Sequence, residues 1–580
     1  MRSAWLSTLR GNGVRPVHYL GDYHYLVWAN GDSALERLSE LPSRTTWLRS
    51  IRAFDADRKL EASLRAAPAG TSAQDEIAVV IQVYRHGNWS STRRLLESLA
   101  RVPMAQQAPA GQSSANPEWS EVLDYANVTL LLRRDDLLRV AALPDVTFIG
   151  PKLEMRQYDE KQNLILAGHL SPHAQTPDYL ETLIDLGFSQ NPDDYPIVDV
   201  VDSPIHEGGS GAGVVATADS MLRTGGNLLG ASRVVSFRNC SSRPDSAVYA
   251  TDGHGSLNAG IVAGWDQATG WPWQDTDGHQ LGLGVNPFGR IASTAIFVPQ
   301  HSVANCGNDE TGLIRDTWLR GALISSNSWG SVPPPTTYET GAQAYDAGVR
   351  DADPQTPGNQ QQIILFAAGN DGSRAASIGA PGTGKNVITV GASENVRPQW
   401  IDGCGAGLLD ADNANDIATF SSRGPAPGQR VKPEFVAPGT HVQARASIHP
   451  SYVDIGTGVC DHYYPQGQTI FAASSGTSHS TPAVAGLVSL VWHWLQSDGQ
   501  GSIQALSGTR PPSPSAMKAW LMAHPIWLNG VSSGDSLPSN NQGYGMPDLA
   551  SMFDQTNKVM LDQSVVLKLP RTAGGQEAIF

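Results

Sequence analysis

Apolar and polar positions alternate in two different ways along this chain of 580 residues. In roughly the first 155 residues, β-branched and aromatic runs such as 77–84 alternate with amphipathic stretches such as 91–99. Such runs are typical of strands and helices, respectively. The same patterns predict strands over 23–29, 46–51, 128–132 and 146–149 and helices over 33–38 and 136–143. We therefore predict two small α+β modules, both βαβ-like, without a cluster of catalytic residue types.

From about residue 177 onward, apolar runs bounded by glycine are separated by helical stretches. Continuous apolar strands are typical of a parallel sheet that is buried on both faces. The strand-like runs are 197–201, 233–236, 290–297, 322–326, 362–367 and 386–390. This pattern predicts an α/β domain, a parallel sheet with helices on both faces. Polar residues at the carboxyl ends of its strands are candidates for a site, because ligands bind there in such sheets.

Three polar residues are candidates for this site, two of them after strand-like runs and one at the start of a helix. Asp202 ends the first strand-like run, although an Asp before Ser-Pro is also ordinary turn chemistry. His254 lies between two glycines and opens a helix of small residues that can pack closely against the sheet. Asn370 follows the run 362–367 in an Asn-Asp-Gly turn, and its amide could donate to a developing oxyanion.

Ser478 lies where a tight turn opens a buried helix, because apolar residues recur at helical spacing over 482–491. Pro482 fits the first turn, where its missing N–H has no intrahelical partner. A serine at a helix start is most often a cap. It can also be a nucleophile beside an oxyanion hole made by the helix N-terminus. The serine alone does not decide between these two interpretations.

The composition narrows the classes of protein. Hydrophobic residues make up 40% and charged residues 16%, which indicates a globular chain. The net charge of −15 argues against nucleic acid as the main partner and against an anionic membrane surface. No apolar run approaches the ~20 residues that span a bilayer. The first residues lack the apolar core of a signal peptide, so the protein is intracellular or its signal was removed.

Four cysteines, Cys240, Cys306, Cys404 and Cys460, lie far apart without a C-x-x-C pair, which argues against a zinc cluster. They allow one or two disulfides, whose pairing the sequence leaves open, and they favour an oxidising compartment.

Four segments, in the order Asp202, His254, Asn370 and Ser478, together resemble the motifs of the subtilisin-like serine proteases (subtilases). The motif segments are Val-Val-Asp-Ser, His-Gly-Ser with a following Ala-Gly, Ala-Ala-Gly-Asn and Gly-Thr-Ser-x-Ser-x-Pro. Further segments resemble the high-molecular-mass, oxidatively stable alkaline branch, namely 327–330, 380–383, 420–425, 432–440 and 541–545. The resemblance covers about 177–553.

The resemblance implies a serine endopeptidase that acts on polypeptides and needs no cofactor for its chemistry. It implies Asp202, His254 and Ser478 as the catalytic triad and Asn370 in the oxyanion hole. Ser328, Trp329 and Gly330 would bind the substrate backbone as an added strand, together with Gly369. We expect a monomer that is secreted or extracytoplasmic.

The region before the resemblance is similar to a subtilase propeptide. We expect a chaperone-inhibitor over 1–165, whose C-terminal tail occupies the cleft, and a linker with the autocleavage region over 166–176. The cut itself is predicted between Gln162 and Gln175. A catalytic domain over 177–555 follows. Residues 556–580 are predicted as a β extension or as the start of a truncated sandwich domain.

Subtilases commonly bind Ca²⁺, and one loop offers the oxygen ligands that this ion prefers. The candidates are Asp410, Asp412, Asn413 and Asp416. The loop lacks the Gly and the terminal Glu of an EF-hand, so a solvated acidic loop is an equal alternative.

The chain departs from the family pattern near the predicted site. Ser203-Pro204 follows the aspartate, Leu257-Asn258 stands where His-Val is common, and Glu434 stands where Asp is usual. His479 replaces the Met that commonly follows the nucleophile, which removes an oxidisable side chain. These departures leave open a catalytically silent subtilase that acts as a binding module. The acidic charge and Asp371 beside Asn370 would suit basic residues near the cleavage site, which leaves open a narrow-specificity maturation protease for one partner precursor.

Overall fold

A computed structural model describes most of the chain. The described residues are 3–21, 24–65, 74–87, 89–100, 119–151, 154–157, 163–168, 179–205, 219–275, 278–335, 337–397, 402–407, 409–452, 458–497, 511–534 and 536–553. The chain forms two compact units, one of Met1–Lys152 with Thr336–Thr340 and one of Leu153–Pro335 with Gly341–Phe580. The predicted C-terminal extension over 556–580 lies outside the described residues.

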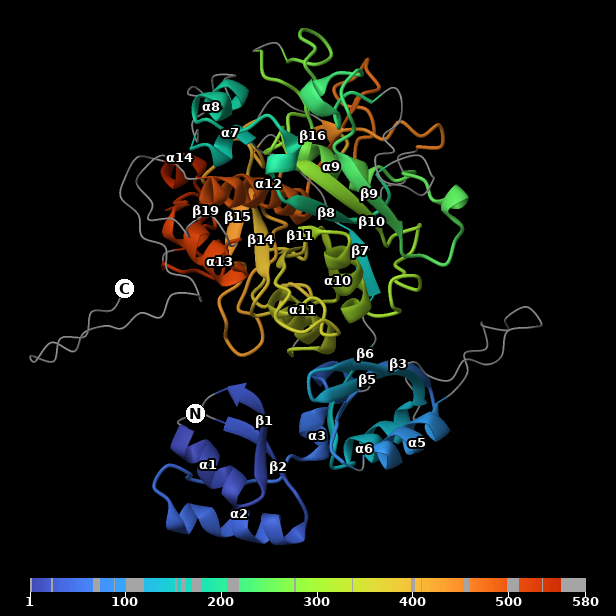
Figure 1. Ribbon diagram of the computed structural model, residues 1–580, viewed down its shortest axis with the longest axis vertical. Helices are drawn as coiled ribbons and strands as arrows, with labels where there is room; N and C mark the ends of the chain where they lie inside the picture. Colours follow the sequence, from blue (N-terminus) through green and yellow to red (C-terminus); the bar gives the residue numbers. More distant parts are fainter. Residues whose placement is uncertain are drawn as a thin grey trace, which may run out of the picture. The chain divides into compact units, whose positions relative to one another are not determined.

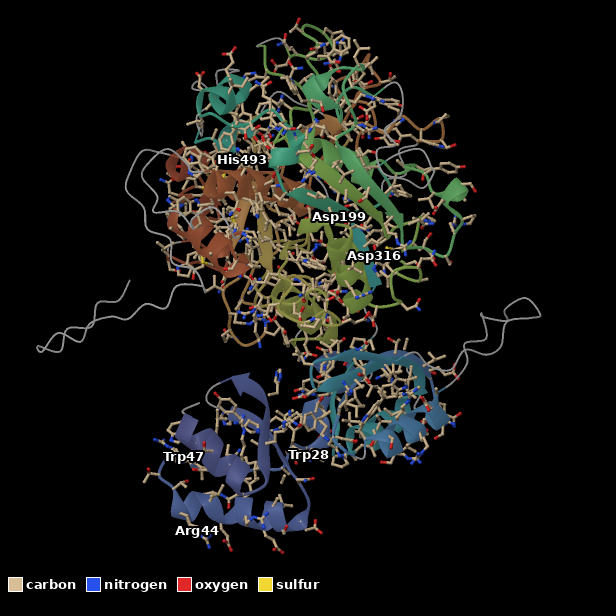
Figure 2. The ribbon with its side chains drawn as sticks, in the orientation of Figure 1. Trp28, Arg44, Trp47, Asp199, Asp316 and His493 are labelled. Carbon is tan, nitrogen blue, oxygen red and sulfur yellow. A yellow bond between two sulfur atoms is a disulfide. The ribbon has the colours of Figure 1, made fainter. Side chains whose placement is uncertain are left out.

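The smaller unit begins with a β-hairpin and its helices (Figure 1). The elements are α1 (Ser3–Gly11), β1 (Val14–Gly21), β2 (His24–Ala29), α2 (Asp32–Arg44), α3 (Ala56–Lys59) and α4 (Ala62–Arg65). The two strands are antiparallel, so this module is not of the βαβ kind. The predicted strand over 46–51 is absent from this described part, where Trp47 stacks on Trp5 of α1, with 5.2 Å between ring centroids. Trp28 and Trp47 are labelled in Figure 2.

The second module of this unit has two strand–helix–strand segments. They are β3 (Glu76–Tyr84), α5 (Ser90–Leu99), β4 (Trp119–Val122), β5 (Tyr125–Arg133), α6 (Leu137–Ala141) and β6 (Val146–Pro151). The sheet order is β4-β5-β3-β6, and all neighbours are antiparallel. Each helix therefore joins two strands that run the same way, with another strand between them, as in the split βαβ arrangement. The predicted alternation is confirmed here.

The larger unit contains a seven-stranded parallel sheet with the order β15-β14-β13-β11-β8-β10-β9 (Figure 1). Its strands are β8 (Ile197–Asp202), β9 (Val234–Asn239), β10 (Arg290–Ala295), β11 (Ala322–Asn327), β13 (Ile363–Ala367), β14 (Ile388–Ser393) and β15 (Phe435–Pro438). The predicted α/β class is confirmed. The pattern located every strand but β15, which has only four residues.

Helices cover both faces of this sheet. Successive residues of a strand point to opposite faces. Accordingly, Leu365 belongs to the core that contains α9 (His254–Ala263) and α12 (Thr477–Gln496). Phe366 belongs to the core that contains α10 (Glu310–Leu319) and α11 (Thr340–Arg350).

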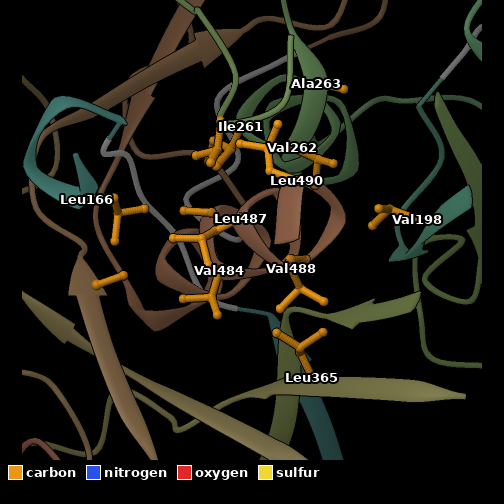
Figure 3. Packing of buried hydrophobic residues seen from close by; sticks show 14 of the residues in the cluster. Leu166, Val198, Ile261, Val262, Ala263, Leu365, Val484, Leu487, Val488 and Leu490 are labelled. Carbon is orange, nitrogen blue, oxygen red and sulfur yellow. The ribbon is translucent and has the colours of Figure 1, made fainter. Parts of the chain in front are cut away.

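Helices α9 and α12 pack against each other over the first of these faces (Figure 3). Ile261 and Val262 of α9 lie beside Leu490 of α12. On the sheet side of α12, Val488 lies over Leu365. The tight contact fixes the N-terminal ends of both helices relative to the carboxyl ends of the strands.

A buried ion pair connects the other face to its helix. Asp199 of β8 and Asp316 of α10, both labelled in Figure 2, bind the same guanidinium of Arg320, at 3.0 and 2.9 Å. Because Asp199 is fully buried, the pair is strongly sensitive to the loss of either partner.

Shorter elements complete the larger unit. They are β7 (Glu154–Gln157), α7 (Asn163–Leu166), α8 (Tyr179–Asp185), β12 (Trp329–Val332), β16 (Val442–Arg445), β17 (Phe471–Ser474), α13 (Pro514–Ala523), β18 (Pro525–Ile526), β19 (Met546–Pro547) and α14 (Leu549–Met552). The 3₁₀ turns are Arg134–Asp136, Pro192–Asp194, Thr224–Gly226 and Asp245–Ala247. None of the described helices has the length and apolar character that crossing a membrane requires.

Both possible disulfides form. Cys240 is bonded to Cys306 and Cys404 to Cys460. The structure thus supplies the pairing that the sequence left open.

Candidate active site

Asp202 and His254 form a buried pair at the carboxyl end of the sheet. Asp202 is the last residue of β8, and His254 is the first residue of α9. The Nδ1 atom of His254 lies 2.5 Å from Oδ1 of Asp202, and neither side chain is exposed. The backbone N–H of Ser203 also donates to Oδ1, at 2.6 Å. This arrangement fixes the orientation of the imidazole ring.

Two glycines bring the helix start close to the strand end. Gly253, the residue before α9, has φ +76°, which favours glycine. Gly255 lies directly against the backbone of Ser203, where a Cβ would be 2.0 Å from the carbonyl oxygen. A larger residue at position 255 would push His254 away from Asp202.

Ser478 is the second residue of α12, and its side chain is buried. The predicted place of Pro482 in the first turn is wrong, because this proline lies inside the helix. Its Oγ donates to the carbonyl of Ser328 at 2.8 Å, while Oγ of Ser328 donates to the carbonyl of Ser478 at 2.5 Å. The next residue, His479, has its ring centroid 5.5 Å from that of His254. The structure therefore brings the helix start that carries Ser478 up to the Asp202–His254 pair.

Asn370 follows β13 and contacts the same helix start. Its side-chain oxygen accepts from the backbone N–H and from Oγ1 of Thr477, at 2.9 and 3.0 Å. The hydroxyl of Thr477 also accepts from the N–H of Gly369, at 3.1 Å. Because Thr477 holds the amide oxygen, the NH₂ group of Asn370 is the side that can donate to a bound group.

Trp329 and Gly330 lie in the short strand β12, beside the nucleophile candidate. The Trp329 side chain is 1% exposed and its indole donates to the carbonyl of Val201, so this ring belongs to the core. The backbone of β12 pairs antiparallel with β7, with Trp329 opposite Gln157 and Gly330 opposite Arg156. An extended segment of the chain thus lies along the strand that was predicted to bind substrate.

Two departures from the family pattern meet next to Asp202. Asn258 lies one turn after His254 on α9, and its amide nitrogen donates to Oδ2 of Asp202 at 3.0 Å. Its amide oxygen is bound to Nδ1 of His479. Burial, together with the nearby His254, lowers the pKa of His479 well below its ordinary value of 6.5, so the ring is neutral. Both residues stand out in the sequence as departures from the family pattern, but the sequence does not indicate that they are in contact.

Another site residue that the sequence analysis missed is Asp252. Its carboxylate accepts from Oγ of Ser203 at 2.7 Å and from the backbone N–H of His254 at 3.2 Å. The feature of the sequence that could have pointed to Asp252 is its position two residues before His254.

The acidic loop contributes to a carboxylate cluster of Glu394, Asp412 and Asp416, whose oxygen atoms lie within 4.8 Å of one another. Of the four predicted ligands, Asp412 and Asp416 belong to it. Asn413 donates its amide to Asp416 at 2.7 Å, and Asp410 instead accepts from the N–H of Gly407. Glu394, which the sequence analysis missed, follows the end of β14.

The cluster fits a cation. Burial, followed by the charges of Asp416 and Asp412, raises the pKa of Glu394 to about 8. Its Oε2 atom is buried without a hydrogen-bond partner in the described structure. Carboxylate oxygens are the ligands that Ca²⁺ prefers, and a divalent ion would offset the crowded negative charge.

Comparison with known proteins places the chain in a family. The model of the subtilase family (Peptidase_S8) matches residues 195–545. The Serine protease/ABC transporter B family protein tagD of Dictyostelium discoideum is 24% identical over 360 residues, 50% of this chain and 18% of that protein. Serine protease AprX of Bacillus subtilis (strain 168) is 33% identical over 132 residues, 22% of this chain and 25% of AprX. The chain thus spans about a fifth to a quarter of the length of these curated relatives.

Among solved structures, that of fervidolysin from Fervidobacterium pennivorans, described as a keratinolytic enzyme related to subtilisin, is similar with a TM-score of 0.49 and 17% identity. The match covers 85% of this chain and 62% of that chain. Since the family match extends over 195–545 of 580 residues, more than half of the sequence, the protein belongs to the subtilase family.

Proposed function

We propose that this subtilase is a serine endopeptidase with Ser478 as nucleophile, His254 as general base and acid, and Asp202 as the group that orients the imidazole. The observation that carries the proposal is the buried 2.5 Å contact between Asp202 and His254, beside the helix start that presents Ser478. The order Asp202, His254, Ser478 along the chain and the contact between Asp202 and His254 agree with this assignment.

In the proposed reaction, the Ser478 hydroxyl turns from the Ser328 carbonyl to Nε2 of His254 and attacks the peptide carbonyl. His254 takes the hydroxyl proton and then delivers it to the leaving amine, while Asp202 stabilises the imidazolium. The NH₂ of Asn370 and the backbone N–H of Ser478 donate to the tetrahedral oxyanion. Water then hydrolyses the acyl-enzyme by the same steps.

Covalent labelling with a fluorophosphonate tests this function. Wild-type protein is expected to gain one label on Ser478, located by peptide mass spectrometry, and the Ser478→Ala variant none. A folded wild type that is neither labelled nor active, also after removal of its N-terminal region, would contradict the proposal and favour the silent binding module.

We also propose that the protein is made as a zymogen that cleaves itself. The support is the pairing of β7 with β12, since this extended segment takes the place that a substrate strand would take beside Ser328. The N-terminal part of the smaller unit, Met1–Lys152, would then belong to the inhibitory propeptide.

The proposed cut lies between Gln157 and Asn163. Part of the range first predicted, 162–175, is described, and there Ile165 and Leu166 of α7 are buried in the core of the larger unit. The other residues of that range lie outside the described residues. Because α7 packs with the larger unit while β7 lies along β12, a cut between them frees the propeptide without disturbing the core. Intact mass of wild type beside Ser478→Ala tests it, and a variant still cut there would exclude self-cleavage.

Two further features belong to this proposal. Glu394, Asp412 and Asp416 would hold a structural Ca²⁺, which has no part in the chemistry. The two disulfides support a secreted or extracytoplasmic protein, because disulfides persist in oxidising compartments.

A further inference from the structure

We propose that His479 and Asn258 act as positioning residues that hold the carboxylate of Asp202, and through it His254, in the reactive orientation. The inference rests on the proposed function, because it assigns a purpose to groups that touch the triad without touching substrate. The two residues are far apart in the sequence, and both replace residues that are common in the family.

The contacts form one continuous chain. Asp202 uses Oδ1 for His254 and for the backbone N–H of Ser203. Asn258 donates to the other oxygen, Oδ2, at 3.0 Å, and its nitrogen also lies 3.2 Å from Nδ1 of His254. His479 binds the amide oxygen of Asn258 from the opposite side. Asp202, Asn258, His254 and His479 are all fully buried.

His479 decides which way the Asn258 amide faces. A neutral imidazole carries one N–H, and its proton on Nδ1 can be donated to the amide oxygen. This bond keeps the NH₂ group toward Asp202. In the reverse orientation, the amide oxygen would face a carboxylate, an unfavourable contact in a buried site where polar interactions are strong. A Met at position 479, which lacks a donor, would leave the amide orientation unsupported.

The position of Asn258 on α9 adds to this role. Residues four apart on a helix lie on the same face, so Asn258 and His254 both face Asp202. The interaction therefore joins β8, α9 and α12 through side chains at the point where the proposed chemistry occurs.

A double-mutant cycle with His479→Met, Asn258→Val and the double variant tests the inference. Rates are expressed per site that a fluorophosphonate titrates, so unfolded protein does not count. Each single variant is expected to lower kcat about tenfold with KM little changed. Asn258→Val removes the hydrogen bond to the charged Asp202, and His479→Met removes the bond that orients its donor. The double variant is expected to lose no more than either single variant.

The pH profile of kcat/KM separates positioning from packing. Among the described residues, the titratable groups next to His254 are Asp202 on β8, Asp252 in the preceding turn and His479 on α12. Without the donor from Asn258, the negative charge of Asp202 is shared with one hydrogen-bond donor fewer and attracts the imidazolium form of His254 more strongly. The acidic limb should therefore move to higher pH in both single variants and no further in the double variant. The lowered pKa of His479 favours its neutral form, so replacement by Met changes no formal charge next to His254. Asp252 is present in all variants, so it does not account for a difference between them.

His479→Asn provides the rescue, because its side-chain N–H reaches about the same place as Nδ1, and it should recover most of kcat. His479→Gln places its donor farther out and should recover less. Ser480→Ala, which removes a buried hydroxyl of the same helix bonded to the Ala437 carbonyl, is the matched control and should show no coupling to Asn258.

Additive losses with an unmoved acidic limb, or equal rates for His479→Asn and His479→Met, would overturn the inference. If His479→Met does not fold, the comparison of the Asn and Gln variants decides. A wild type that is never labelled at Ser478 would instead contradict the proposed function, so the two failures are distinguishable.

Discussion

Asn370, the proposed oxyanion donor, has its side chain held in place by a neighbouring residue. Thr477 occupies its amide oxygen with two hydrogen bonds, so the amide nitrogen keeps a fixed direction. Preorganised donors of this kind stabilise the oxyanion without a reorganisation cost at the moment of reaction.

We therefore expect Asn370→Ala to lower kcat by about 10²–10³ while KM changes little. Steady-state kinetics with a peptide substrate measure the effect. Thr477→Ser, which keeps the hydroxyl, should remain within a few-fold of wild type. A normal kcat in Asn370→Ala would remove this residue from the oxyanion hole.

Glu434 is a second residue whose surroundings explain a departure from the family pattern. Its carboxylate binds Nζ of Lys432 at 2.7 Å and Nζ of Lys518, on helix α13, at 2.6 Å. It also accepts from the N–H of Thr389 on β14, at 2.8 Å. One side chain thus joins the strand segment before β15 to the neighbouring strand and to a helix.

Burial lowers the pKa of Lys432 to about 7, even beside Glu434. Glu434→Gln is therefore expected to destabilise the protein by about 3–5 kcal/mol below pH 7, where Lys432 is charged and remains buried without its counter-charge. Burial alone would raise the pKa of Glu434, but Lys432 and Lys518 outweigh it and lower the pKa below 4.5. The carboxylate of Glu434 therefore makes its full contribution to the stability of the folded state above pH 4.5, its ordinary pKa. This contribution is lost as the pH falls through the lower pKa of the folded state.

Denaturant unfolding between pH 7 and 3 measures this contribution. Wild type should lose stability on acidification more steeply than Glu434→Gln, whereas Glu434→Asp keeps a charge and should keep the slope. Identical slopes in wild type and Glu434→Gln would contradict the assignment.

At the scale of elements, the pairing of β7 with β12 offers a matched experiment. In an antiparallel pair, the N–H and C=O of one residue point to the partner strand and those of the next residue point away. Proline removes the N–H. Of the variants Met155→Pro and Arg156→Pro, one therefore breaks a hydrogen bond to β12 and the other does not.

We expect self-cleavage to be clearly slower in one of these two variants than in the other, measured as the half-time of conversion by intact mass. The mature enzymes should have equal activity, because both changes lie before the proposed cut. Equal half-times that match wild type would show that β7 does not present the chain to Ser478.

The sequence predicted those parts of the fold whose signals are local. Each residue of the proposed triad lies at the start of a helix or the end of a strand, and short sequence motifs reveal these places. Contacts between distant segments were not predictable in this way. The pairing of β7 with β12, the bond between Asn258 and His479, and the approach of Glu394 to the acidic loop all depend on the completed fold.

The βαβ-like modules illustrate the same limit. Strand and helix patterns identified β3, α5, β5, α6 and β6, but periodicity does not say which strands are neighbours. In the first module, Trp47 stacks on Trp5, and the strand-like run that contains Trp47 forms an irregular segment.

For the whole molecule, the carboxylate cluster predicts a dependence on calcium. Millimolar Ca²⁺ should raise the melting temperature of wild type, and a chelator should lower it, because a ligand that binds only the folded state stabilises it. Glu394→Gln should lose most of this response, whereas Asp410→Asn, outside the cluster, should keep it. Calorimetry with Mg²⁺ as the control ion measures the difference. An equal response of Glu394→Gln and wild type would place the ion elsewhere.

The Cys404–Cys460 bond links the cellular environment to the reaction itself. Gly458, two residues before Cys460, lies so close to His254 that a Cβ there would be 3.1 Å from the Cβ of the histidine. The disulfide therefore anchors a wall of the active site. While the cysteines are reduced, this wall has one anchor fewer, so we expect the proposed activity to develop fully only after the disulfide has formed. For an exported protease, as proposed above, the reducing cytosol would thereby protect the producing cell until export.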